Sequence, residues 1–123
     1  MRIAIDIQGI QSDGSRNRGI GRYSLQIIRN LINQYSEVDF ILVANSSLYN
    51  VKDKFKEELK KNKRVTYFSW YSPQPVSFLS QNKNNIILGT QLRNYTFSCL
   101  HVDIIIFTSY IEGSSDNCLT TLT

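Results

Sequence analysis

Four short apolar segments, separated by stretches with helical periodicity, constrain the fold of this chain more than any other feature. The segments are rich in isoleucine and valine and alternate poorly, which is typical of strands buried on both faces of a parallel sheet. They predict strands at 2–8, 38–44, 65–70 and 102–107.

The stretches between the strands repeat apolar residues every three or four positions, as a helix with one buried side does. The first predicted helix follows a loop at 9–18, the second takes its N-cap from 45–47, and the third, at 86–100, follows a polar connection at 72–85. The residues predicted to face the core are Ile20, Tyr23, Ile27, Ile28, Leu31 and Tyr35 in the first helix, Val51, Phe55 and Leu59 in the second, and Leu88, Leu92, Tyr95 and Cys99 in the third.

The order of these elements, β-α-β-α-β-loop-α-β, predicts the fold class. Strands that alternate with helices form an open parallel sheet through right-handed crossovers. We therefore expect an α/β fold, a Rossmann-like open parallel sheet with flanking helices. A chain of 123 residues has about the usual size of one domain, so 1–123 is expected to be a single unit.

Composition and the N-terminal sequence indicate the cellular compartment of the protein. Hydrophobic residues make up 41% and charged residues 20%, as in an ordinary globular domain. Cys99 and Cys118 lie far apart without the spacing of a metal or disulfide framework, which favours a reducing compartment. Asp6 interrupts the first apolar run too early for a signal peptide, and no segment approaches the ~20 apolar residues of a membrane span. These features predict a cytoplasmic protein.

The junction of the first loop and the first helix is the strongest candidate for a binding site. In open α/β sheets, ligands bind beyond the carboxyl ends of the strands. Gly19 and Gly21 allow backbone N–H groups to approach a ligand closely, and a helix N-terminus favours an anion. Arg16, Arg18 and Arg22 add charges suited to phosphate. A helix start that tolerates glycine, beside solvated arginines, accounts for the same residues by spacing alone.

This junction departs from the known nucleotide-binding fingerprints. The third glycine of a dinucleotide motif would fall at Ser24, and Asn45 stands where an acidic residue would close the second strand. A Walker A loop is absent from the sequence.

Two motifs resemble the start of group 1 (family 4) glycosyltransferases. The first comprises 1–9 (MRIAIDIQG) and 16–23 (RNRGIGRY), and the second runs from 102–105 (VDII) to Glu112-Gly113. Members of that family are retaining enzymes of the GT-B architecture, in which two Rossmann-like domains face each other across a cleft. The resemblance implies that 1–123 is the N-terminal, acceptor-side domain and that the C-terminal, donor-binding domain lies outside this chain.

The resemblance also implies a function. The whole enzyme would be a retaining glycosyltransferase of hexosyltransferase type, moving a sugar from a nucleotide-sugar donor to a glycan or lipid-linked acceptor, without a metal or other cofactor. Bacterial polysaccharide biosynthesis is the setting that the family suggests. The positions that match the family's donor-phosphate loop are Gly19, Ile20, Gly21 and Arg22, and the candidate contacts to acceptor or phosphate are Arg16, Arg18 and Glu112.

By the same resemblance, no residue of this chain is expected to be catalytic. The family's Glu-x7-Glu pair belongs to the second domain. The one histidine, His101, is expected to link the third helix to the fourth strand. The isolated chain is therefore expected to be inactive.

A second feature of the sequence is a run of seven basic residues between Lys52 and Arg64, on a chain of net charge +4. Such a run could contact the inner face of an anionic membrane, although acidic residues dilute it and a solvated helix face is the alternative. The one aromatic residue among these lysines, Phe55, is predicted to face the core and so is not free for base stacking, and nucleic acid is not an expected partner. A self-contained nucleotide- or phosphate-binding regulatory domain remains the alternative for the whole chain.

Overall fold

The computed structural model describes residues 1–12, 19–71 and 83–108. The strands are β1 (Arg2–Asp6), β2 (Asp39–Asn45), β3 (Val65–Trp70) and β4 (Ile104–Phe107). The helices are α1 (Gln8–Gln11), α2 (Gly19–Gln34), the 3-10 helix η1 (Lys52–Phe55), α3 (Lys56–Lys61) and α4 (Lys83–Cys99).

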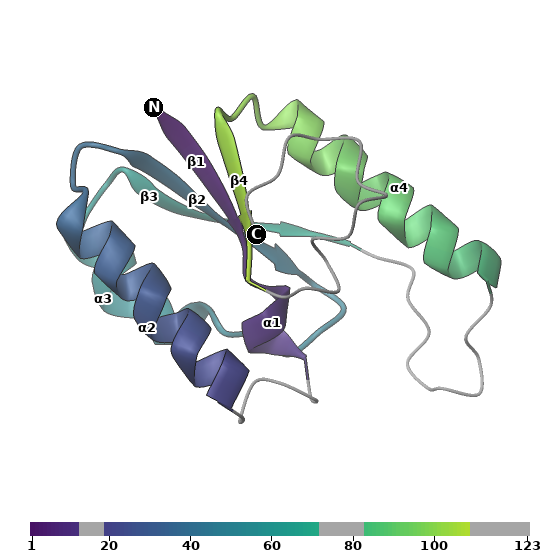
Figure 1. Cartoon of the computed structure of the whole chain (residues 1–123), viewed down its shortest axis with the longest axis horizontal. Coiled ribbons are helices and arrows are strands. Elements are labelled where there is room, and N and C mark those ends of the chain that lie inside the picture. The colour runs from purple at the N-terminus through teal and green to yellow at the C-terminus, as the bar shows by residue number, and fades with distance from the viewer. Residues whose placement is uncertain (13–18, 72–82, 109–123) are drawn as a thin grey trace.

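The four strands form one parallel sheet in the order β3-β2-β1-β4. Ile5 of β1 lies opposite Leu42 of β2 and Ile106 of β4. Helices α2 and α3 cover one face of the sheet and α4 covers the other (Figure 1). The predicted fold class is confirmed: the chain is an α/β domain with a Rossmann-like open sheet.

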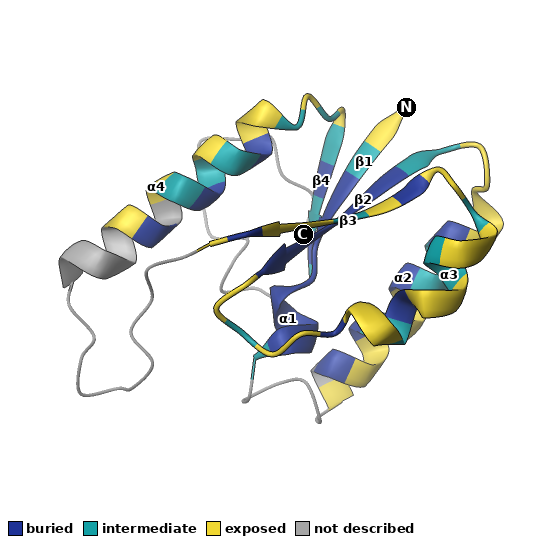
Figure 2. Ribbon diagram, turned by 180° about the vertical axis from the view of Figure 1, so that it is seen from behind, coloured by how far each residue is buried: buried dark blue, intermediate teal, exposed yellow. Residues whose placement is uncertain are grey.

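The core has two layers, one on each face of the sheet. Alternate residues of a strand point to opposite faces, so Ile5 packs in the layer under α2 and α3 while Ala4 packs in the layer under α4. Phe55, which is fully buried, anchors the first layer. In the second layer the rings of Phe97 and Phe107 meet edge to face, with centroids 5.6 Å apart. In Figure 2 the buried residues lie in the strands, in α1 and along parts of α2 and α4.

The predicted loop at 9–18 is wrong at its start. Strand β1 ends at Asp6, and the next residues form α1, a single helical turn with all four residues buried. Ile7 and Ile10 are both fully buried, so this turn is held by the core rather than by helix propensity. Their three-residue spacing was a signal for the turn.

The buried side of α2 also differs from the prediction. Ile28 is buried as predicted, together with Ser24 and Ile32, which were not predicted. Tyr23 and Ile27 lie on an exposed strip of the helix, and Tyr35, just after its end, is exposed as well. The four-residue spacing of the predicted residues was real, but it belongs to a second stripe beside the buried one. Leu31 lies partly buried between the two stripes.

The prediction for α4 is wrong for three of its four residues, whereas the fourth, Leu92, packs against the core as expected. Leu88 and Tyr95 are exposed, and Cys99, predicted to lie in the core, is an exposed free cysteine. The line that faces the sheet contains Arg93 and Phe97 instead. A hydrophobic pattern could not find this line because a charged residue stands in it.

The second helical segment was predicted correctly except at its start. Val51 and Phe55 are buried, as expected. The side chain of Asn45 does not cap this segment, because its Oδ1 accepts the backbone N–H of Ser47 within a tight turn. Asn50 makes a similar turn just before η1, where its Oδ1 accepts the N–H of Lys52, and the N-cap residue Val51 makes no side-chain cap.

Candidate functional site

The order of the strands defines where a ligand can approach the sheet. From β1 the chain moves through β2 to β3 on one side, and then crosses back to place β4 on the other side of β1. Such a reversal opens a crevice at the carboxyl ends of the two strands it separates. Here those ends are Asp6 of β1 and Phe107 of β4, which pair in register.

Helix α2 begins at this crevice. Ser24 in its second turn donates a hydrogen bond to the carbonyl of Thr108, at 3.4 Å, and the Thr108 hydroxyl donates to the carbonyl of Asp6, at 2.8 Å. These two bonds tie the first turns of α2 to the ends of β4 and β1. The structure thus brings the start of α2 to the crevice at the end of β1.

Within the first turn of α2 the predicted residues differ in exposure. Gly19 and Arg22 are exposed, whereas Gly21 is buried against the fold. No acidic residue stands among these first four positions of the helix to neutralise its N-terminus. A ligand at the crevice can therefore meet the backbone of Gly19 and the guanidinium of Arg22, but Gly21 serves packing.

Three of the predicted contacts, Arg16, Arg18 and Glu112, lie outside the described residues, and so does the side chain of Ile20. His101 is exposed in the turn between α4 and β4, at the amino end of the sheet, with a φ of 51°. This position agrees with the expected linker and lies away from the crevice.

Asp6 stabilises the turn that follows β1. It is buried, and its Oδ1 accepts the backbone N–H of Gln8 at 2.8 Å, which fixes the turn into α1. Its side chain shares the α4 face of the sheet with that of its register partner Phe107.

Arg93, which sequence reasoning missed, stands on the same face. It is buried, and its guanidinium carbon lies 5.5 Å from the centroid of the Phe107 ring. The Arg93 guanidinium thus packs against the ring at the carboxyl end of β4. No sequence pattern indicated it, because a charged residue is not expected on the buried side of a helix.

The side chain of Gln11 holds α1 over the end of β2 through hydrogen bonds. Its Nε2 donates to the carbonyls of Asn45 and Tyr49, both at 3.0 Å, and its Oε1 accepts the N–H of Asn45 at 2.9 Å. Asn45 is only 1% exposed as a result. The place where a dinucleotide ribose would meet an acidic residue is therefore closed by α1.

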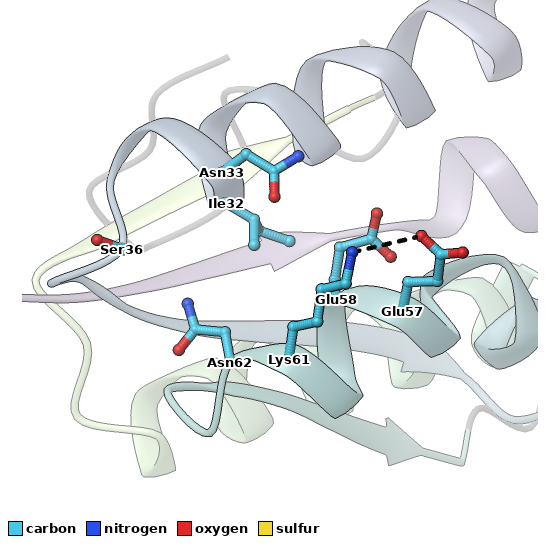
Figure 3. A pocket seen from close by; sticks show the side chains of 7 residues that line it. All are labelled: Ile32, Asn33, Ser36, Glu57, Glu58, Lys61 and Asn62. Atoms are coloured by element: carbon cyan, nitrogen blue, oxygen red, sulfur yellow. Dashed lines mark ion pairs between the residues drawn. The ribbon is translucent and has the colours of Figure 1, made fainter.

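Two hollows lie between α2 and α3, away from the crevice. One, of about 320 Å³, is lined by residues from the C-terminal ends of both helices, among them Asn33, Ser36 and Lys61 (Figure 3). The other, of about 450 Å³, lies beside Arg29 and the start of α3. The first is at the amino end of the strands, which is the edge opposite to the one that ligands use in open sheets.

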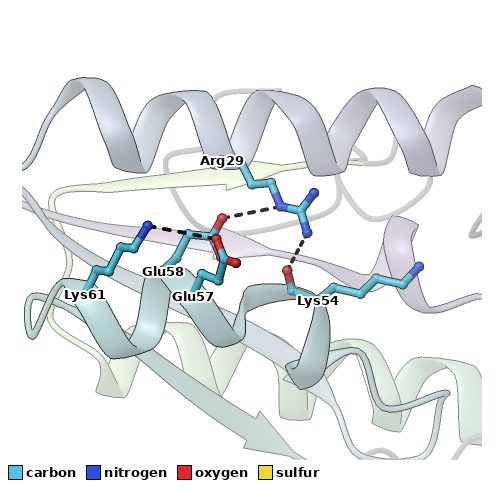
Figure 4. Close-up of polar contacts among 5 residues, drawn as sticks. All are labelled: Arg29, Lys54, Glu57, Glu58 and Lys61. Atoms are coloured by element: carbon cyan, nitrogen blue, oxygen red, sulfur yellow. Dashed lines mark hydrogen bonds and ion pairs between the residues drawn. The ribbon is translucent and has the colours of Figure 1, made fainter.

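The charges around these hollows join the two helices to each other. Arg29 donates to the carbonyl of Lys54 at 2.6 Å and pairs with Glu58 at 3.4 Å, and Lys61 lies 4.0 Å from Glu57 (Figure 4). Two acidic residues within the basic run are thus engaged in ion pairs. The exposed pair on α3 contributes little to stability, whereas the half-buried Arg29 holds α3 against α2.

Contact with a membrane surface stays a prediction for this face. Neither α2 nor α4, nor any shorter helix among the described residues, has the length and hydropathy of a membrane-spanning segment. In the same three described ranges, no group of His, Cys, Asp and Glu side chains is placed to hold a metal ion.

No protein-family model, no curated protein and no solved structure matches this chain. Its function is consequently inferred from the residues at the crevice.

Proposed function

We propose that this chain is the N-terminal, acceptor-side domain of a retaining glycosyltransferase that moves a sugar from a nucleotide-sugar donor to a glycan or lipid-linked acceptor. The start of α2 faces the donor's diphosphate in this proposal. The remaining donor contacts and the catalytic groups belong to a second domain outside this chain. The resemblance of 1–9 and 16–23 to family 4 enzymes motivates the proposal, and the geometry of Gly19 supports it.

The glycine at position 19 is the main support for the proposal, because neither its backbone conformation nor the packing of the described residues around it requires a glycine. Its φ is not positive, and a Cβ built on it would meet no heavy atom within 4 Å in the structure as described. Glycine also has more conformational freedom in the unfolded chain than alanine, and this freedom is lost on folding. A glycine that neither conformation nor packing requires is accounted for by a ligand that approaches the backbone closely.

The chemistry assigned to these residues is electrostatic. Backbone N–H groups at the start of α2, together with Arg22, would hold the diphosphate and stabilise the negative charge that grows on it as the sugar leaves. Charge stabilised in this way at a preorganised site lowers the barrier without any proton transfer. This role needs no catalytic residue from the present chain.

The hydrogen bonds between Gln11 and Asn45 favour a half-site, meaning a donor site shared with a second domain, over a self-contained nucleotide-binding domain. A complete dinucleotide domain holds the ribose with an acidic residue at the end of its second strand. Here that position is a buried asparagine under α1. A self-contained regulatory domain would therefore need to bind its nucleotide without the usual ribose contact.

Replacing Gly19 by alanine is the test of the proposal. We expect Gly19→Ala to raise the free energy of unfolding by about 0.4–1 kcal/mol, because the unfolded chain loses freedom and the folded chain has room for the methyl group. We expect it to weaken the binding of UDP or GDP about tenfold, because the methyl group separates the phosphate from the backbone. Amide chemical shifts of the 123-residue chain, followed during titration with UDP, GDP and NAD, give both the site and the affinity.

The matched control is Asn30→Ala, an exposed position further along α2. It should leave the nucleotide affinity unchanged. Weak binding of UDP or GDP, with shifts at 19–22 and none with NAD, supports the half-site. Tight binding would favour the self-contained domain, and an unchanged affinity in Gly19→Ala would show that the assignment of the loop is wrong.

A further inference from the structure

Strand β3 forms one edge of the sheet, and its outer side is open. Among the described strands it has a neighbour on one side only, where its pairing with β2 runs unbroken from Val65 to Trp70. The strand contains no proline, no charged residue and no bulge, which are the features that usually protect an edge from pairing. A further strand can therefore add to the sheet at this edge.

The backbone groups on the open side of β3 follow from its bonds to β2. The Phe40 N–H donates to the carbonyl of Arg64 at 2.9 Å. In a parallel pair every second residue bonds to the same neighbour, so positions 64, 66 and 68 bond to β2. Tyr67 and Ser69 consequently turn their N–H and carbonyl groups to the open side. Among the described residues, no backbone hydrogen bond from another element ends on either of them.

The two faces of the sheet differ in chemistry beside this edge. On the face that α3 covers, the ammonium of Lys52 lies 5.8 Å from the centre of the Tyr67 ring. On the α4 face, Phe68 is 42% exposed, on the same side of the strand as the buried Trp70. A strand added here would meet positive charge with one set of alternate side chains and an apolar ring with the other.

The positive charge continues along the flank of α3 that lies away from α2. Glu58 faces α2, where it pairs with Arg29 (Figure 4). Successive residues of a helix are about 100° apart, so Lys60, two positions after Glu58, points to the opposite flank, beside β3. Lys60 and Lys63 are both exposed. Lysines at this edge repel those of a second copy, so they disfavour self-pairing and favour an acidic partner.

We propose that the open edge of β3 binds an extended acidic segment of another protein, which adds to the sheet as a further strand. The backbone of the segment bonds to Tyr67 and Ser69. Its side chains alternate, with acidic groups toward Lys52 and Lys60 and apolar groups against Phe68. The inference concerns the edge of the sheet opposite to β4 and does not depend on the proposed function.

The probe is a synthetic peptide of about six residues, the usual length of a strand, in which glutamate alternates with valine. On binding to the 123-residue chain, it should slow amide hydrogen exchange at Tyr67 and Ser69 about tenfold or more, because their N–H groups gain acceptors. Exchange at Thr66 and Phe68 should change less than about twofold, since these groups already bond to β2. A peptide in which all the glutamates precede the valines should bind at least about fivefold more weakly.

Ser69→Pro and Ser69→Ala form a matched pair at one exposed position. Proline is tolerated on an edge strand where its nitrogen faces solvent, and there it removes the N–H that a partner strand needs. We expect Ser69→Pro to weaken binding of the alternating peptide about tenfold or more, and Ser69→Ala to change it less than about twofold. Circular dichroism checks that both variants fold.

If Ser69→Pro does not fold, charge reversal on α3 tests the same edge. Lys60 and Lys61 are both exposed, but Lys61 lines the hollow between α2 and α3 (Figure 3). We expect Lys60→Glu to weaken binding of the alternating peptide about fivefold or more. Lys61→Glu should change it less than about twofold at physiological salt, where charges are screened over about 8 Å.

Peptide binding without slower exchange at Tyr67 and Ser69 would overturn the proposal, and so would equal affinities of the two peptides. Two other occupants would also overturn it. Binding of phosphatidylserine vesicles that Lys60→Glu abolishes, with no binding of either peptide, would assign the lysines to a membrane surface. Sedimentation showing a dimer that Ser69→Pro makes monomeric would assign the edge to a second copy.

Discussion

Truncating Phe55 to alanine is expected to lower the free energy of unfolding by about 3–5 kcal/mol. The ring is fully buried in the layer between α3 and the sheet, so its removal leaves a cavity as well as losing apolar burial. Domains of this size have about 5–15 kcal/mol of stability in total, so the variant should lose a large share of it. Urea denaturation followed by circular dichroism measures the change.

Phe68→Ala is the matched control for Phe55→Ala. Phe68 lies in β3 and is 42% exposed, so the same chemical change should cost less than about 1 kcal/mol there. Equal losses in the two variants would mean that Phe55 is not the anchor of its layer.

Replacing Gln11 by alanine should cost about 1–3 kcal/mol, because the buried backbone N–H of Asn45 loses the Gln11 Oε1 that accepts it. The side chain makes three hydrogen bonds to the backbone of Asn45 and Tyr49, and alanine leaves the buried N–H and carbonyl of Asn45 without these contacts. The loss should be largest around α1, so amide hydrogen exchange should quicken at 8–11 and at Asn45 before the rest of the sheet.

Gln26→Ala, at an exposed position of α2, removes the same side chain where it makes no such contacts among the described residues. Its unfolding free energy should stay within about 0.5 kcal/mol of the parent chain. A small effect of Gln11→Ala, with no change in exchange at Asn45, would show that α1 is held by Ile7 and Ile10 alone.

The sheet could be predicted from the sequence because its strands are buried on both faces. A segment such as Ile104–Phe107 carries only apolar residues, and so short an apolar run, bounded by polar residues, is typical of a strand inside a parallel sheet. That the sheet is open and parallel followed from the alternation of strands and helices, whereas the strand order β3-β2-β1-β4 was not predicted. The start of α2 could be placed at the crevice by the same reasoning, since the carboxyl ends of parallel strands meet at one edge.

The inner sides of the helices were harder to predict. On α2 two apolar stripes lie side by side, and periodicity cannot say which of them faces the sheet. On α4 the buried line includes Arg93, which no hydrophobic scale would place there. In both helices the choice is made by the shape of the sheet they meet, which is tertiary information.

The polar part of the site could not be predicted for a different reason. Gln11 contacts Asn45 across 34 residues of sequence, and Thr108 contacts Asp6 across 102. No sequence pattern around a glutamine or a threonine predicts such a distant partner. Only the folded backbone brings these groups together.

The pairing of β1 with β4 has a consequence for the order in which the molecule forms. β1, β2 and β3 and the helices between them are close in sequence, whereas β4 must join β1 from about 100 residues away, and such distant contacts form slowly. Until β4 arrives, β1 is an edge strand with unpaired backbone groups, which invites aggregation. During synthesis, therefore, the crevice is the last part of the sheet to be completed, and it exists only after Thr108 has left the ribosome.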